Sequence, residues 1–289
     1  EWNYKLIDSL GLDQSLLSDL AESCTPAGAL TRQMAAKLGV KTGIPVSVAS
    51  GDHQCSFAGT VTDYEKTLAI NIGTGGQASV YVEHAISRGW LELRPFIQSG
   101  YLLAGVGVVG GRTFRTLKDF FKHSSSELTG YEIDSDVMYE KLVELATNVP
   151  AGSEGVVVDP LFTGSRSNPR AKAAIREITP GTFTPGHIAR ALFEAMASQL
   201  AGSYREAVKL GAGERSFLIG SGNGLKLNPV LWESINAELG MHVQLSPHNE
   251  EAAIGAALCA AVADGSFNSM NEASASFLNF IPPSTSDEA

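Results

Sequence analysis

The sequence predicts an α/β fold built of α+β layers, and three observations carry the prediction. Four short runs rich in β-forming residues follow one another between residues 66 and 108, separated by glycines. Strand and helix patterns then alternate from residue 156 to residue 263. Apolar residues make up 44% of the 289 residues and charged residues 18%, which favours a packed core over a disordered or fibrous chain. Strands followed by alternating helices and strands are typical of a layered fold.

The first 60 residues predict short helices and one strand. Apolar residues at spacings of three and four, broken by glycine, are typical of short amphipathic helices, and a compact run rich in valine is typical of a strand. The predicted elements are two short helices within residues 1–22, a helix over 31–38, a buried strand over 45–49 and a small-residue helix over 55–60.

Residues 66–147 predict a group of strands and then helices. The strands are short, glycine-bounded and close in sequence, which predicts an antiparallel meander. After Gly110-Gly111 the apolar spacing becomes helical, with Phe114, Leu117, Phe120 and Phe121 on one face. The predicted strands cover 67–72, 77–82, 91–97 and 101–108, and a further helix covers 136–147.

The second half of the chain alternates more regularly. Its strand patterns are short and apolar, and its helix patterns are longer and end at or near glycine. The predicted strands cover 156–159, 217–219 and 243–245, and the predicted helices cover 187–210, 228–239 and 250–263.

Charge and cysteine content limit the function classes. The 21 basic and 31 acidic residues give a formal net charge of −10, which is unfavourable for binding nucleic acid or an anionic membrane. No apolar run approaches the roughly 18 to 20 residues of a membrane span. Cys24, Cys55 and Cys259 lack metal-type spacing, so we expect reduced thiols in a cytoplasmic protein. The chain starts without methionine, inside a predicted helix, so we expect a piece of a longer protein.

Three glycine-containing turns each follow a predicted strand. They contain Gly73-Thr74-Gly75, Gly110-Gly111 and Gly220-Ser221-Gly222-Asn223. Glycine lets a ligand approach the backbone, and successive N–H groups can hold phosphate oxygens. For any one loop taken alone an ordinary turn is the favoured explanation, and none carries the Lys-Ser/Thr of a Walker loop. The three together predict a polyanion site that needs no basic surface.

Asp52 stands where an apolar strand is expected to meet a helix. A rigidly held carboxylate at such a junction suits a general base. On sequence alone an N-cap is the favoured explanation of the same residue, because aspartate is among the best capping residues, and the two roles are compatible. The neighbouring His53 is by default a surface histidine or one that is hydrogen-bonded internally.

These segments together resemble the FGGY family of carbohydrate kinases. The resemblance extends from Trp2 to about Ala263, and within the family it is greatest to sedoheptulokinases. The matching segments, in the family's order, are 43–46, 51–54, 72–76, 163–169, 220–223, 228–232 and 250–257.

The resemblance implies a ribonuclease-H-like ATPase fold of the actin, hexokinase and Hsp70 type. It implies that residues 1–62 are the C-terminal tail of an N-terminal, sugar-binding domain whose remainder, with its first phosphate motif, is absent. Residues 63–289 would then be the C-terminal nucleotide-binding domain. The implied partners are that missing domain and a small sugar or polyol, and a homo-oligomer is possible.

The implied activity is ATP-dependent phosphorylation of a hydroxyl of a small sugar or polyol, a ketose such as sedoheptulose or xylulose, with Mg²⁺. By the same resemblance Asp52 is the general base, and His53 occupies a substrate-binding position that usually carries an amide. Arg166 matches an element for which a salt bridge and a substrate role are equal alternatives. The implied nucleotide contacts are Gly73, Thr74 and Gly75 at the β- and γ-phosphates, Gly110 and Gly111 beside the nucleotide, Gly220, Ser221, Gly222 and Asn223 at the adenosine, and Asn228 at the adenine edge.

Two other functions remain open on the sequence alone. The first is a nucleotide-binding domain without catalysis, because the first phosphate motif of the family is not in this chain. The second is a structural or sensory relative that has lost activity, against which the intact Asp52 counts.

Overall fold

A mixed six-stranded sheet forms the centre of the molecule in the computed structural model, which describes residues 2–108, 110–164 and 168–278. The strand order is β10-β9-β3-β4-β6-β5. Strands β3, β9 and β10 run parallel, and β4, β6 and β5 pair antiparallel. The predicted α/β class is therefore confirmed. The bounds are β3 Thr67–Ile72, β4 Gly76–Val82, β5 Glu92–Pro95, β6 Tyr101–Val108, β9 Phe217–Ser221 and β10 Val243–Leu245.

The predicted meander is wrong in one connection. Strand β6 lies between β4 and β5, so β5 is the edge strand although it precedes β6 in sequence. Strand β5 is only four residues long and ends at Pro95, which has no N–H to donate to a further neighbour. A short strand that ends at proline is suited to an edge position.

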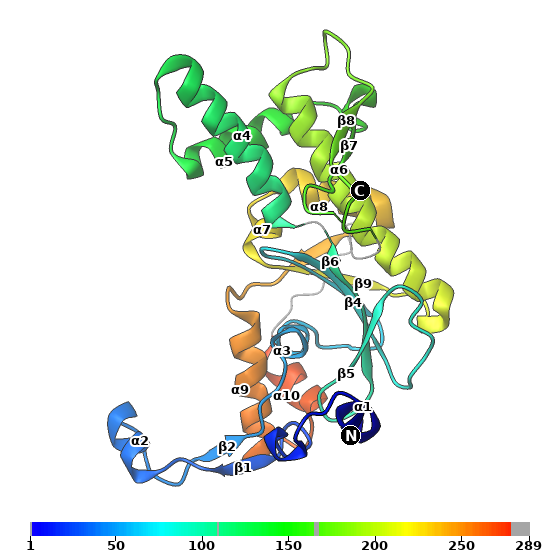
Figure 1. The fold of residues 1–289 in the computed structure, drawn as a ribbon. Coiled ribbons are helices and arrows are strands. Elements are labelled where there is room, and N and C mark those ends of the chain that lie inside the picture. The colour runs from blue at the N-terminus through cyan, green and yellow to red at the C-terminus, as the bar shows by residue number, and fades with distance from the viewer. Residues whose placement is uncertain (1, 109, 165–167, 279–289) are drawn as a thin grey trace, which may run out of the picture.

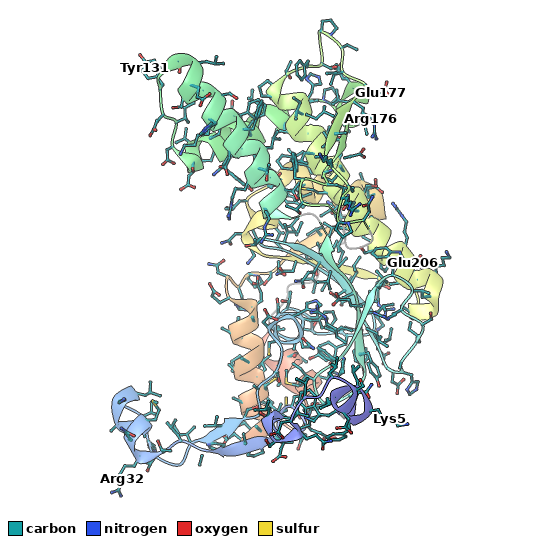
Figure 2. All side chains as sticks on the ribbon, in the orientation of Figure 1. Lys5, Arg32, Tyr131, Arg176, Glu177 and Glu206 are labelled. Carbon is teal, nitrogen blue, oxygen red and sulfur yellow. The ribbon has the colours of Figure 1, made fainter. Side chains whose placement is uncertain are left out.

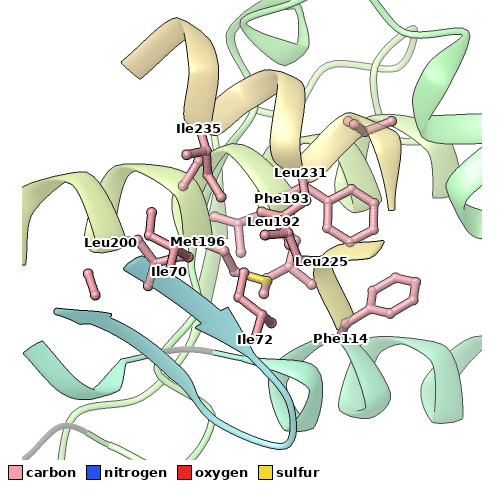
Figure 3. Close-up of a cluster of buried hydrophobic side chains, with 14 of the residues drawn as sticks. Ile70, Ile72, Phe114, Leu192, Phe193, Met196, Leu200, Leu225, Leu231 and Ile235 are labelled. Carbon is pink, nitrogen blue, oxygen red and sulfur yellow. The ribbon is translucent and has the colours of Figure 1, made fainter. Parts of the chain in front are cut away.

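Helices cover both faces of the sheet (Figure 1). On one face Leu68, Ile70 and Ile72 of β3 belong to one core with Phe193 and Met196 of the long helix α6. Figure 3 shows Ile70 and Ile72 beside Met196. On the other face a second core includes Phe57, Leu102, Ile219, Leu258 and Met270. The helices are α6 Pro185–Ala207 and α8 Pro229–Leu239 on the first face, and α3 Asp52–Ala58, α9 Glu251–Ala263 and α10 Met270–Phe277 on the second.

A smaller group of elements extends beyond the first face. The predicted helices after Gly110 and at 136–147 are present, but Phe120 is 61% exposed and does not share the buried face of Phe114 and Leu117. The elements of this group are α4 Gly111–Thr129, α5 Ser135–Thr147, β7 Val157–Asp159 and β8 Ala174–Arg176; the short α7 Asn223–Lys226 instead contacts β3 and β9 of the central sheet.

Residues 26–47 form an arm that projects from the second face (Figure 1), whereas Cys24 just before it is buried in the second core. The strand predicted as buried over 45–49 is β2, which pairs only with β1 and is partly exposed. Although α9 contacts β2, Val46 is 44% exposed, so the prediction of burial is wrong. The elements of the first 50 residues are α1 Tyr4–Ser9, the 3-10 turn Gln14–Leu16, β1 Pro26–Ala29, α2 Arg32–Leu38 and β2 Pro45–Ser47.

Helices α3 and α9 pack closely against each other at two glycines, Gly59 and Gly255. An ideal Cβ on Gly255 would lie 1.8 Å from the carbonyl oxygen of Cys55, and one on Gly59 would lie 2.1 Å from that of Glu251. Cys24, Cys55 and Cys259 are buried beside this contact and carry free thiols. Within the described residues, no helix has the length and apolar character needed to cross a membrane.

Candidate functional site

The three glycine loops meet at one end of the sheet, where strands β3 and β9 terminate. Strands β3 and β9 are parallel neighbours, so their carboxyl ends lie side by side, and β4 starts at the same edge. Gly222 has a positive φ of 83°, and a Cβ there would lie 2.4 Å from the carbonyl oxygen of Ile72, the last residue of β3. The structure therefore brings the loop after β9 against the turn between β3 and β4.

The turn between β3 and β4 also contacts the start of α4. The N–H of Gly111 donates to the carbonyl of Gly73 at 2.9 Å, and that of Arg112 donates to the carbonyl of Thr74 at 2.9 Å. A Cβ on Gly110 would lie 2.3 Å from the carbonyl carbon of Gly75, so only glycine permits this approach. The positive end of the α4 dipole is thereby placed against the turn.

The turn itself faces outward. Gly73, Thr74 and Gly75 are exposed, and a Cβ on Gly75 would meet nothing within 4 Å. Because two N–H groups of α4 are used within the protein, the groups offered to a ligand are the Thr74 hydroxyl and the outward backbone of the turn. An exposed glycine turn beside a helix N-terminus is compatible with a bound phosphate chain.

Residues 220–228 divide into an exposed and a buried part. Asn223 is exposed, whereas Ser221 is buried and accepts a hydrogen bond from Nδ2 of Asn71 at 2.8 Å. Gly220 is buried, and a Cβ there would meet Leu225 at 2.4 Å.

Asn228 caps a helix instead of facing a ligand. It is 1% exposed, and its Oδ1 accepts the N–H of Leu231 at 3.1 Å as the N-cap of α8. The nucleotide contacts predicted for Gly220 and Asn228 therefore find no support here, because both residues serve internal packing.

Asp52 is the first residue of α3, and it is exposed. The N-cap position belongs to Gly51, which makes no side-chain cap, so the alternative of Asp52 as the N-cap is wrong. Its Oδ1 accepts the N–H of His53 at 2.7 Å. A carboxylate in the first turn of a helix is favoured by the helix dipole. The side chain is thus anchored at one oxygen and accessible to a ligand.

His53 points into the protein. Its Nε2 lies 2.8 Å from the Ser79 hydroxyl, and Nη1 of Arg94 lies 3.1 Å from its Nδ1. Burial, and secondly the charge of Arg94, lower the pKa of His53 to about 4, with Asp52 acting in the opposite direction. Both ring nitrogens are engaged inside the protein, so the sugar contact predicted for His53 finds no support in this geometry and stays a prediction.

A small internal pocket joins α3 to the strand ends. His53 lines it together with Asn71, Ser79 and Ser221, all on the face of the sheet that α3 covers. The predictions did not include Asn71, Ser79 or Arg94. A polar residue at alternate positions of an apolar strand, as in Thr67–Ile72, is the signal that points to Asn71. Arg166 lies outside the described residues.

No metal site is preformed in the described parts of the chain. Residues 2–108, 110–164 and 168–278 contain no group of three or more His, Cys, Asp or Glu placed to hold a metal ion. Mg²⁺ commonly binds through one or two carboxylates, water and substrate phosphates, so a preformed protein cage is not required for it.

Comparison with known proteins identifies the family. The sequence model of the C-terminal domain of the FGGY family of carbohydrate kinases matches residues 69–263, and that of the N-terminal domain matches residues 1–59. The chain belongs to the FGGY family of carbohydrate kinases. Autoinducer-2 kinase of Escherichia coli (strain K12) is 30% identical over 281 residues, which cover 94% of this chain and 52% of that relative. Glycerol kinase of Pseudomonas syringae pv. tomato is 26% identical over 282 residues, which cover 94% of this chain and 51% of that relative.

Solved structures of FGGY kinases share the fold. Xylulose kinase from Rhodospirillum rubrum superposes with a TM-score of 0.78 at 24% identity, covering 94% of this chain and 53% of that chain. Plasmodium falciparum glycerol kinase with ADP has a TM-score of 0.74 at 19% identity, covering 95% of this chain and 53% of that chain. The predicted fold of the actin and hexokinase type is confirmed.

The comparisons do not decide which member of the family this chain resembles most or where its domain boundary lies. The chain spans about half the length of the curated FGGY relatives named above. The relatives named are autoinducer-2, glycerol and xylulose kinases, so the narrower likeness to sedoheptulokinases stays a prediction. The domain boundary between residues 62 and 63 also stays a prediction.

Proposed function

We propose that this chain is the nucleotide-binding part of a kinase that transfers a phosphoryl group from ATP to a hydroxyl of a small sugar or polyol. The observation that carries the proposal is the meeting of the three glycine loops at the carboxyl ends of β3 and β9. Loops at the carboxyl ends of adjacent parallel strands are a common ligand-binding arrangement. Membership of a carbohydrate kinase family supports the same activity.

In this proposal the exposed turn of residues 73–75 holds the phosphates. The Thr74 hydroxyl and outward backbone groups contact the β- and γ-phosphates, and Gly111 at the start of α4 adds the positive end of a helix dipole. Gly222 and Asn223 lie on the adenosine side. ATP supplies the phosphoryl group, and Mg²⁺ accompanies its phosphate oxygens without an assigned protein ligand.

Asp52 is the proposed general base. Phosphoryl transfer needs chiefly positioning and charge stabilisation, with a group to accept the proton of the attacking hydroxyl. The exposed carboxylate, anchored through Oδ1 on the N–H of His53, meets that requirement on geometry. The residues of the substrate pocket are left unassigned, because His53 is engaged inside the protein.

The substrate class is a ketose or other small polyol, with sedoheptulose and xylulose as candidates. A coupled ATPase assay with sedoheptulose, xylulose, ribulose, glycerol, erythritol and autoinducer-2 tests this on the full-length protein. We expect turnover with at least one of them and the greatest kcat/KM with a ketose. Turnover with none would remove the proposed substrate class.

Replacing Asp52 tests the proposed base. Asp52→Asn keeps an oxygen for the N–H of His53 but cannot accept the proton, so kcat should fall by about 100- to 10,000-fold. The affinity for ADP, measured by calorimetry, should stay within about twofold. Asp136→Asn is the matched control, because Asp136 is an exposed acid in the first turn of α5. Turnover retained in Asp52→Asn would exclude Asp52 as the base.

The rest of an FGGY N-terminal domain is the proposed partner. Large apolar side chains of the projecting arm, including Met34, Leu38, Ile44 and Val46, are 43 to 62% exposed, which supports a covering partner in the full-length protein. The alternative of a binding domain without catalysis is tested by assaying this chain alone for ADP binding and turnover. A homo-oligomer and a cytoplasmic location stay predictions.

A further inference from the structure

A chain of hydrogen bonds lies directly behind Asp52. Oε2 of Glu92 accepts from Nε and Nη2 of Arg94 at 2.9 and 2.5 Å, and Nη1 of Arg94 lies 3.1 Å from Nδ1 of His53. Nε2 of His53 lies 2.8 Å from the Ser79 hydroxyl. The chain therefore runs from the edge strand β5 through the first turn of α3 to β4.

This series of hydrogen bonds determines which ring nitrogen of His53 carries the proton. A guanidinium has only donors, so Nδ1 of His53 must accept from Arg94. The proton of the neutral ring is then on Nε2 and is donated to the Ser79 hydroxyl. A second proton on Nδ1 would place two donors and two positive charges against each other. The arrangement therefore disfavours the cationic form of His53 at neutral pH.

The same strand also holds the first turn of α3. Nε2 of Gln54 donates to the carbonyl of Pro95 at 3.1 Å, so β5 contacts two successive residues of α3 after Asp52. Asp52 in turn is bonded to the N–H of His53. The position of the Asp52 carboxylate thus depends on the contact between β5 and α3.

Among the described residues, the charged groups that act on His53 are Asp52 on its own helix and Arg94 on β5. Glu92, also on β5, pairs with Arg94 and balances its charge. The groups presented by β3, β4 and β9 are neutral, namely Asn71, Ser79 and Ser221. Asp52 is therefore the group whose environment changes if His53 becomes charged.

We propose that Arg94 is a positioning residue for Asp52: through Nδ1 of His53 it holds a neutral imidazole beside the carboxylate and fixes the first turn of α3. The proposal rests on the proposed role of Asp52 in phosphoryl transfer. Without Arg94, His53 gains a proton at higher pH than in the wild type, and the charge of the resulting imidazolium attracts the Asp52 carboxylate. The carboxylate is then withdrawn from the acceptor hydroxyl.

The first test observes His53 without any turnover. In ¹⁵N-edited NMR spectra of this chain, wild-type His53 should show the neutral Nε2–H form down to about pH 5, following its pKa of about 4. In Arg94→Met the midpoint should rise above about 4, because the charge of Arg94 is the second cause of the lowered pKa of His53, while burial still keeps it below the ordinary histidine value. A wild-type Nδ1–H form, or a midpoint unchanged in Arg94→Met, would overturn the proposal.

The second test measures kcat against pH in the full-length protein. Arg94→Met should lose activity by about tenfold per pH unit below the new histidine midpoint, while the wild type shows no such loss there. Arg94→Met with His53→Gln should remove the new pH dependence, because glutamine does not titrate. A structural defect alone would lower kcat equally at every pH, and parallel profiles would therefore contradict the proposal.

Controls separate the possible failures. Arg32→Met removes an exposed arginine at the far end of the arm (Figure 2) and should match the wild type in both tests. If Arg94→Met does not fold, Arg94→Gln retains a donor for Nδ1, and the wild-type NMR form alone still decides the tautomer. Absence of turnover in the wild type would refute the proposed function, whereas the NMR result on His53 would stand.

Discussion

Adjacent residues of α3 have opposite environments, and the difference is decided far away in sequence. Asp52 is exposed, whereas His53 is 7% exposed and bonded to residues 26 and 41 positions later. The local pattern of strand, glycine and acid was enough to predict the position of Asp52. It could not predict the direction of His53, because Ser79 and Arg94 reach it only through the assembled sheet.

The buried neutral His53 predicts a loss of stability in acid. The folded pKa of about 4 lies below the ordinary value of 6.5, so only the unfolded chain gains the proton between these values. The contribution is complete above about pH 6.5 and is lost as the pH falls toward 4, amounting to about 2 to 3 kcal/mol. Urea unfolding at pH 7 and 4.5 measures it, with His53→Gln as the non-titrating reference. An equal loss in both proteins would show that another group is responsible.

At the level of elements, local patterns predicted most long helices and central strands. They missed β1, β8, α7 and α10, which are short, and they misplaced β5 and the burial of β2. Pairing partners and covering layers decide those features, and neither is contained in a local pattern. The glycine loops were predicted individually, but the contact of Gly110 with Gly75 follows only from the sheet order.

The contact between the β3–β4 turn and α4 should depend on Gly110. In Gly110→Ala the Cβ would lie within 2.5 Å of backbone atoms of Gly75 and Gly76, so the elements must separate. We expect a cost of about 1 to 3 kcal/mol in unfolding free energy and weaker ADP binding. Gly202→Ala in α6 is the control, since its Cβ meets nothing within 4 Å. Equal melting and ADP affinity in both variants would contradict a close contact at Gly110.

At the scale of the whole molecule, the central sheet separates two cores, one on each of its faces. One face carries the larger apolar core under α6 and α8, and the other carries α3 with the polar chain from His53 to Glu92. The three loops lie at the edge where these faces meet. An acidic chain with net charge −10 thus offers a phosphate ligand backbone groups and a helix dipole instead of a basic surface.

The measurement that tests the central claim most directly is hydrogen–deuterium exchange of this chain with and without ADP. The account predicts slower exchange together in residues 71–76, 110–113 and 220–226, with little change in the projecting arm. The large open pocket lined by residues 62–66, 97–99 and 269–271 serves as an internal comparison site. Protection confined to that pocket, or at only one of the three loops, would contradict a shared nucleotide site at the edge of the sheet.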